Sequence, residues 1–107
     1  MEAPHTDCPL SPCVKLLAGT WTLEILYYLR QQPLRYGELR RALGKISSKV
    51  LTVRLREMEQ RGILDRRVIP TNPPMVEYSL SEIGLALLPV LDVLSEVSTR
   101  LHETYGL

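Results

Sequence analysis

Residues 47–62 read SSKVLTVRLREMEQRG, and the rest of the predicted fold is arranged around this segment. Leu51, Leu55 and Met58 recur at i, i+4 and i+7, which places them along one face of a helix. Ser47 is a favoured N-cap residue, and Gly62 is the residue type most common just past a helix C-terminus. The segment therefore predicts a helix that buries one face against a core.

The neighbouring segments on both sides complete a recognisable motif. A second helix is predicted from about Tyr36 to Leu43, and the turn Gly44-Lys45-Ile46 joins it to the first. Two helices connected by so short a turn containing glycine form a helix-turn-helix. After Gly62, the β-branched run Ile63 to Ile69 and the alternating run Met75 to Leu80 predict a β-hairpin, which in this position is a wing.

The remaining segments give the order of elements. Helices are predicted from about Pro12 to Ala18 and Thr22 to Arg30, with a short strand from Leu34 to Tyr36 and a long last helix from Glu82 to Tyr105. Because Pro89 cannot continue a straight helix, we expect a kink or break near residues 85–88. The sequence predicts a mainly α fold with a small β-wing, a winged helix-turn-helix in the order α-α-β-α-α-β-β-α. Residues 1–9 are predicted to form an N-terminal arm, and residues 10–107 a single domain.

Composition excludes several classes of protein. Hydrophobic residues make up 45% and charged residues 23% of 107 residues, an ordinary globular balance. No apolar run approaches the roughly 18 residues of a membrane span, and the N-terminus lacks a signal-peptide pattern, so we expect a cytoplasmic protein without a membrane partner. The few cysteines and histidines predict neither a metal site nor a cofactor. The sequence shows no pairing of a nucleophile with a base, no phosphate loop and no carboxylate pair. We therefore expect that the protein is not an enzyme.

Charge is distributed unevenly along the chain although the net charge is only +1. Residues 39–56 contain six basic side chains and no acidic one. Residues 77–107 contain five acidic side chains and a single basic one, Arg100. A basic segment within a helix-turn-helix favours contact with a polyanion such as double-stranded DNA.

The exposed face of the helix in residues 47–62 is the candidate reading surface. Its predicted base contacts are Ser48, Lys49, Thr52, Val53 and Arg56, and the branched Val53 could meet a thymine methyl group. The predicted phosphate contacts are Arg40, Arg41, Lys45, Arg66 and Arg67. The alternative is a solvated helix face with an incidental exposed valine, and Arg66 could instead pair with Asp65 or Glu77.

Apolar residues in the last helix recur with heptad spacing. The positions Ile83, Leu87, Val90, Leu94, Val97 and Leu101 step by 4, 3, 4, 3 and 4, and Leu91 widens the seam. We expect these seven residues to form the interface of a homodimer, because DNA-reading proteins often use two-fold symmetry to span two half-sites. The alternative is that the seam packs on the chain's own helices.

The two cysteines, Cys8 and Cys13, are candidates for redox sensing. Cys8 lies in the predicted arm, and Cys13 lies near the first turn of the first helix, where a thiol pKa can fall. The alternatives are an inert arm thiol and a small core residue, respectively.

Several motifs together resemble the HxlR-type family of bacterial winged-helix transcription regulators, which are relatives of the MarR group. They are Cys8-Pro9, Gly19-Thr20-Trp21, the segment from Leu34 to Arg41, the segment from Ile46 to Thr52, the segment from Leu55 to Glu59, Gly62-Ile63-Leu64 and the segment from Pro73 to Leu80. The resemblance implies a homodimer held by the first and last helices, a reading helix in the major groove and a wing near the minor groove. It also implies that Cys8 matches the cysteine through which some members sense oxidants or electrophiles, by linking to another thiol across the dimer.

These observations favour a sequence-specific regulator that binds palindromic DNA as a homodimer. The alternative is a winged-helix module that binds other proteins and not DNA, since a fold alone does not determine a function. The sequence points to no particular small-molecule effector.

Overall fold

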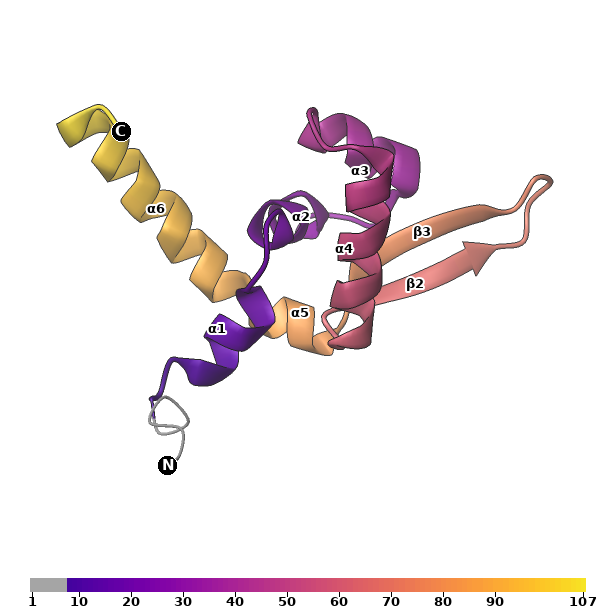
Figure 1. Ribbon diagram of the computed structural model, residues 1–107, viewed down its shortest axis with the longest axis horizontal. Coiled ribbons are helices and arrows are strands. Elements are labelled where there is room, and N and C mark those ends of the chain that lie inside the picture. The colour runs from indigo at the N-terminus through magenta and orange to yellow at the C-terminus, as the bar shows by residue number, and fades with distance from the viewer. Residues whose placement is uncertain (1–7) are drawn as a thin grey trace.

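The computed structural model describes residues 8–107, and its order of elements agrees with the predicted one (Figure 1). Its helices and strands are α1 (Ser11–Leu17), α2 (Thr22–Leu29), β1 (Leu34–Arg35), α3 (Tyr36–Leu43), α4 (Ser48–Gln60), β2 (Leu64–Ile69), β3 (Met75–Leu80), α5 (Glu82–Ala86) and α6 (Leu88–Tyr105). The predicted arm, residues 1–9, lies outside the described residues except for Cys8 and Pro9. No helix within residues 8–107 is long and apolar enough to cross a membrane.

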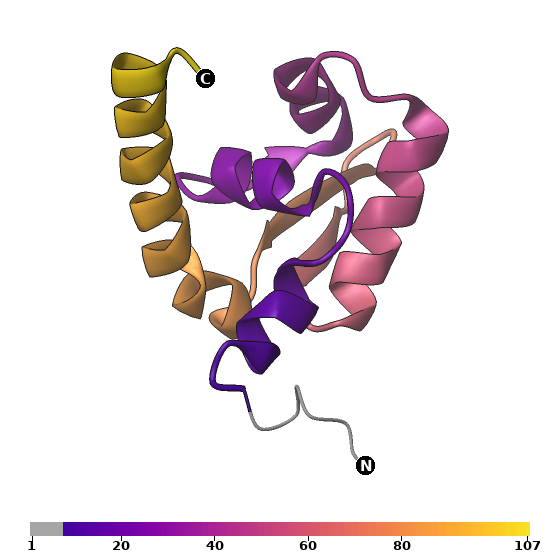
Figure 2. The same cartoon turned by 60° about the vertical axis from the view of Figure 1, so that its left-hand side comes forward.

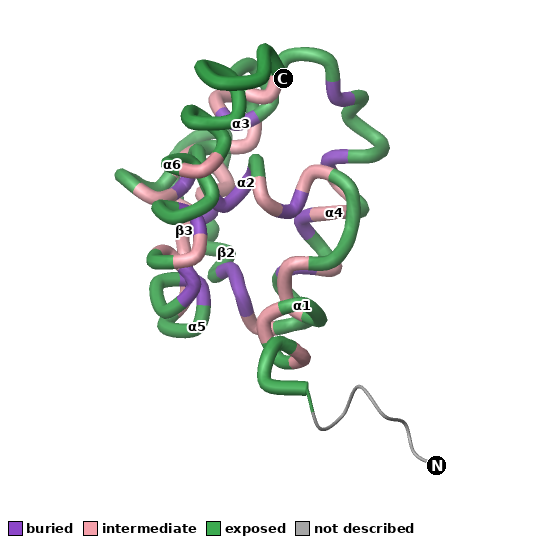
Figure 3. Tube along the Cα trace, turned by 90° about the vertical axis from the view of Figure 1, so that its left-hand side faces the viewer, coloured by how far each residue is buried: buried purple, intermediate pink, exposed green. Residues whose placement is uncertain are grey.

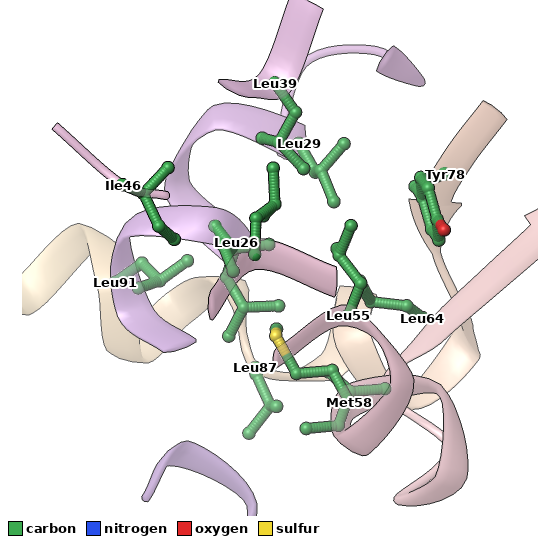
Figure 4. Packing of buried hydrophobic residues seen from close by; sticks show 13 residues of the cluster. Leu26, Leu29, Leu39, Ile46, Leu55, Met58, Leu64, Tyr78, Leu87 and Leu91 are labelled. Atoms are coloured by element: carbon green, nitrogen blue, oxygen red, sulfur yellow. The ribbon is translucent and has the colours of Figure 1, made fainter. Parts of the chain in front are cut away.

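The hydrophobic core forms where α2, α3 and α4 meet the base of the sheet. Buried side chains from these elements point toward one another in Figure 4, and they form one cluster. Leu51, Leu55 and Met58 of α4 are at most 1% exposed, which confirms the predicted buried stripe. Burying apolar side chains of this size contributes about 1.5–3 kcal/mol each, so α4 is held firmly by one face while its other face stays outside.

The helix-turn-helix is set by local signals at its ends. The Ser47 hydroxyl accepts a hydrogen bond from the backbone N–H of Val50 at 3.1 Å, as expected of an N-cap. Gly44, directly after α3, has a positive φ of +79°, which glycine adopts without a Cβ clash. These features begin α4 at Ser48 and turn the chain sharply between the two helices.

The wing belongs to a three-stranded antiparallel sheet in the order β1-β3-β2. In the register of β2 and β3, Arg66 lies opposite Tyr78 and Arg67 lies opposite Glu77. Successive side chains of a strand point to opposite faces, so the two arginines lie on opposite faces of the wing. This separation decides which of the two positive charges lies near α4.

The last predicted helix is broken, as the position of Pro89 predicts. The break separates α5 from α6 at Leu87, and Pro89 occupies the first turn of α6, where it costs no helix hydrogen bond. From there α6 extends away from the body on the side opposite the wing (Figure 1), and most of its residues are exposed (Figure 3). Helix α2 lies between α6 and α4, so α6 and the candidate reading helix occupy different sides of the molecule (Figure 2).

Candidate nucleic-acid interface

The outer face of α4 combines exposed polar, basic and apolar side chains. Ser48, Lys49 and Arg56 are exposed, and Val53 is 42% exposed although it is apolar. Val50, which was not among the base contacts predicted from the sequence, is also exposed, in the first turn of α4. An exposed methyl surface beside hydrogen-bond donors is the combination that reads base edges in the major groove.

Thr52 differs from the other predicted base contacts because its hydroxyl is already engaged. The Thr52 hydroxyl donates to the backbone carbonyl of Ser48 at 2.8 Å, and the Tyr36 hydroxyl donates to the same carbonyl at 2.9 Å. The two hydroxyl oxygens lie 3.2 Å apart. Sequence reasoning missed Tyr36, the first residue of α3, which fastens the first turn of α4 to the neighbouring helix.

The start of α3 is held by a reciprocal pair of contacts. The Glu38 carboxylate accepts a hydrogen bond from the Arg35 backbone N–H at 2.8 Å and forms an ion pair with the Arg35 guanidinium at 3.2 Å. These hydrogen bonds stabilise the charged carboxylate, so the pKa of Glu38 lies below its ordinary value. Because Arg35 is neutralised by Glu38, it adds little positive charge to the surface near α4.

The predicted phosphate contacts before α4 remain free to meet an anion. Arg40, Arg41 and Lys45 are exposed. The ion pairs within residues 8–107 are Arg35–Glu38, Arg54–Glu57 and Arg67–Glu77. The basic side chains of α3, of the turn and of the outer face of α4 therefore keep their charge unpaired in the described part of the chain.

The wing arginines, predicted together as phosphate contacts, differ in the structure. Arg67 forms an ion pair with Glu77 at 3.1 Å, on the face of the wing that also carries Arg35. The sequence analysis allowed Arg66 to pair with Glu77. In the strand register Arg67 lies opposite Glu77, which explains why Arg67 forms this ion pair instead. Arg66 points the other way and has no ion pair within residues 8–107.

A cleft of about 470 Å³ lies between α4 and the wing. Thr52, Arg56 and Glu59 line it from α4. Arg66 and Tyr78 line it from the wing, together with Val76. The cleft therefore brings together Arg56 and Arg66, two unpaired cations that are ten positions apart in the sequence.

The residues predicted to form a dimer surface divide into two groups. Leu87 and Leu91 are 4% and 6% exposed and belong to the chain's own core, so these two are corrected to core residues of the single chain. The break before α6 turns this part of the seam toward α2. The others stay accessible: Ile83, Leu94 and Leu101 are exposed, while Val90 and Val97 are half-buried.

The two cysteines have different surroundings. Cys8 is exposed, whereas Cys13 is half-buried and packs against the core. Both are free thiols. Of the two, Cys8 is the more accessible to an oxidant in solution.

Comparison with known proteins shows a family and individual proteins to which this chain is similar. A family described as HxlR-like helix-turn-helix matches residues 16–105. The chain is 41% identical over 91 residues to an uncharacterized HTH-type transcriptional regulator of Halalkalibacterium halodurans, a match that spans 84% of this chain and 80% of that protein. The family match covers the helix-turn-helix, the wing and all of α6.

Two solved structures have the same fold. A MarR-family transcriptional regulator from Porphyromonas gingivalis W83 superposes with a TM-score of 0.83 at 33% identity, over 92% of this chain and 97% of that one. The redox regulator HypR in its reduced form superposes with a TM-score of 0.84 at 32% identity, over 92% and 97% of the respective chains.

Proposed function

Because the chain belongs to the HxlR-like helix-turn-helix family of transcriptional regulators, we propose that it binds DNA sequence-specifically as a homodimer, on a palindromic operator in the cytoplasm. The observation that carries the proposal is the outer face of α4, where Lys49 and Val53 are exposed beside unpaired basic side chains. Burial of Leu51, Leu55 and Met58 fixes this face outward, and α3 and the wing flank it. Contacts from Arg40, Arg41 and Lys45 to phosphates would supply affinity without sequence preference.

The base contacts are proposed for the first turns of α4. Ser48 and Lys49 offer a hydroxyl and an ammonium to base edges, and Val53 offers methyl groups to thymine. Since the hydroxyl of Thr52 already donates to the Ser48 carbonyl and lies 3.2 Å from the Tyr36 hydroxyl, its proposed contact with a base is through its methyl group. Arg56 lies one turn further along the helix and faces the cleft beside the wing.

The homodimer is proposed to form through the exposed and half-buried apolar residues that follow the wing, with a contribution from α1. Val90, Leu94, Val97 and Leu101 belong to α6, Ile83 belongs to α5, and α1 carries the exposed Val14. Since α6 and α4 lie on different sides of α2, this pairing leaves both reading helices accessible (Figure 2). A two-fold dimer then presents the two helices to two half-sites of a palindrome.

Lys49→Ala tests the DNA-binding proposal. A preferred duplex is first selected from a random library, and affinities for it and for a scrambled duplex are measured by fluorescence anisotropy at several salt concentrations. We expect Lys49→Ala to weaken binding to the preferred duplex by about 1–3 kcal/mol and to affect the scrambled duplex less, because a lost base contact reduces discrimination.

The control for this experiment is Arg100→Ala, which removes a positive charge from α6 on the other side of α2. This variant should retain both affinities. If the unmodified protein binds neither duplex at low salt, DNA binding is contradicted and the protein-interaction module becomes the better hypothesis.

A response to thiol oxidants is proposed through the exposed Cys8. The observation that favours it is the accessibility of this thiol, in a chain whose fold matches a redox regulator. Two thiols would form one disulfide across the dimer, and the oxidant would accept the two electrons and two protons released. In this chain the second thiol is either Cys8 or Cys13 of the other copy.

Cys8→Ser tests the redox proposal. We expect diamide to change the affinity of the unmodified protein for its preferred duplex, and we expect Cys8→Ser to abolish the change. Non-reducing electrophoresis should show a linked dimer only when Cys8 is present. Cys13→Ser identifies the second thiol, since it prevents linkage only if Cys13 supplies it. An unchanged oxidant response in Cys8→Ser would refute the role of Cys8.

A further inference from the structure

We propose that the cleft between α4 and the wing holds one phosphate of the DNA backbone, bound jointly by Arg56 from the helix and Arg66 from the wing. This inference rests on the proposed DNA-binding function and deepens it. It assigns Arg56 to anchoring the backbone and removes it from the residues that read bases. In this arrangement the helix and the wing bind the same DNA strand from two sides.

Two arginine side chains face the same cleft. Arg56 and Arg66 line the same cleft from opposite walls, and neither has an ion pair within residues 8–107. An arginine fork donates two parallel hydrogen bonds to phosphate oxygens, so two arginines facing one space suit a group with several acceptor oxygens. Their neighbours Arg54 and Arg67 are instead paired with Glu57 and Glu77.

The cleft carries a net positive formal charge. Its lining contains two arginines and one acid, Glu59, which together give a formal charge of +1. A phosphodiester in a DNA backbone carries a single negative charge, whereas a phosphomonoester near neutral pH carries about −1.5 to −2. The cleft therefore matches a backbone phosphodiester better than a free phosphate compound.

The geometry of the double helix also favours a backbone phosphate in the cleft. A helix in the major groove and a hairpin directed to the adjacent minor groove lie on either side of one sugar-phosphate strand. If α4 enters the major groove and the wing the adjacent minor groove, the strand between the two grooves passes over the cleft. Contacts at this place set how deeply the helix and wing enter their grooves but carry no sequence information.

Tyr36 and Thr52 give the cleft a rigid end. Both line it, and both hydroxyls are hydrogen-bonded to the carbonyl of Ser48. Arg56 is one helical turn beyond Thr52 on the same face of α4, and it is exposed. A phosphate bound here is thus fixed relative to the first turn of α4, where the base contacts are proposed.

The test compares Arg56→Ala, Arg66→Ala and the double variant with Arg67→Ala. Arg67 is adjacent to Arg66 in β2, but it lies on the other face and is paired with Glu77, so it controls for loss of charge from the wing. Affinities for the preferred and scrambled duplexes are measured by fluorescence anisotropy over a range of salt concentrations. Thermal unfolding verifies that each variant is folded.

Arg56→Ala and Arg66→Ala are each expected to weaken binding by about tenfold, and equally on both duplexes, which is about the strength of one charge-assisted hydrogen bond. Arg67→Ala should have a clearly smaller effect. Each phosphate neutralised contributes about 0.9 to the slope of log affinity against log salt. Because both arginines bind one phosphate, the double variant should lower the slope by about 0.9, and two separate phosphates would lower it by about 1.8.

Glu59→Gln provides an independent arm of the same experiment. Removing the only acid in the lining should tighten binding to both duplexes equally, because a carboxylate near a bound phosphate repels it. A Glu59→Gln variant with unchanged affinity for both duplexes would contradict a phosphate in this cleft.

Three further results would overturn the inference while leaving DNA binding intact. They are a loss in Arg56→Ala confined to the preferred duplex, an Arg66→Ala variant that behaves like Arg67→Ala, and a fall of about 1.8 in the slope for the double variant. Inorganic phosphate, compared with chloride at equal ionic strength, should not displace the duplex. Displacement that disappears in Arg56→Ala would assign the cleft to a free phosphate compound. Failure of the unmodified protein to bind any duplex would instead refute the proposed function itself.

Discussion

Leu55→Ala is expected to lower the free energy of unfolding by about 2–5 kcal/mol. Leu55 is 1% exposed in the middle of α4, where it belongs to the core cluster shared with α2 and the base of the sheet. Truncation removes buried methyl groups and leaves a cavity that the surrounding helices can fill only in part. Denaturant unfolding at a fixed protomer concentration measures the change, since the apparent stability of a dimer depends on concentration.

Val53→Ala is the matched control for this prediction. It also truncates an aliphatic residue of α4, two positions away, but Val53 is on the outer face. Its unfolding free energy should stay within about 0.5 kcal/mol of the unmodified protein. Equal destabilisation by the two substitutions would show that α4 does not bury the face described here, and the assignment of its outer face to DNA would then lose its basis.

Gly84→Ala is expected to destabilise the protein by about 1–3 kcal/mol or more, despite the higher helix propensity of alanine. A Cβ on Gly84 would lie 2.4 Å from the backbone carbonyl oxygen of Ile63 and 3.2 Å from the Cβ of Leu80. The Ile63 carbonyl cannot easily move, because it accepts hydrogen bonds from the backbone N–H of Ser81 at 3.0 Å and from the Ser81 hydroxyl at 2.8 Å. The substitution must therefore displace α5 from the base of the wing.

Gly37→Ala, in α3, is the control for Gly84→Ala. The nearest atom to its added Cβ is the end of the Arg41 side chain at 3.7 Å, an ordinary contact. Alanine should preserve stability there or raise it by up to about 1 kcal/mol, because it restricts the unfolded chain. Thermal and denaturant unfolding of the pair separate backbone crowding from the general effect of replacing glycine in a helix. A Gly84→Ala protein as stable as Gly37→Ala would contradict the close approach of α5 to Ile63.

The order of elements follows from short-range signals, which is why the sequence predicts it well. Helix α3 is predicted with the bounds observed, and the N-cap of α4 at Ser47 is confirmed by its hydrogen bond to Val50. The break before α6 follows from the conformational limits of Pro89. Each of these signals depends on residues within a few positions of one another, so no knowledge of the fold is required.

The candidate site is predicted only in part, because its details depend on contacts between distant residues. The alternation of strands places Arg66 and Arg67 on opposite faces, but only the pairing of β2 and β3 shows which one meets Glu77. A heptad pattern marks the apolar seam, but the packing of α6 on α2 decides that Leu87 and Leu91 are core residues. Tyr36 carries no recognisable signal, because its role exists only where its hydroxyl reaches Ser48.

For this chain, residue spacing is enough to predict a winged helix-turn-helix, its buried stripe and its basic face, because periodicity and end signals act within single elements. Which side chains share a surface is settled by the packing of elements far apart in the sequence. Arg61 at the end of α4 donates to the carbonyl of Ala18 at 2.8 Å, and Arg56 and Arg66 line the same cleft. Burial of one common core brings these groups together, and no local pattern encodes the distance between them.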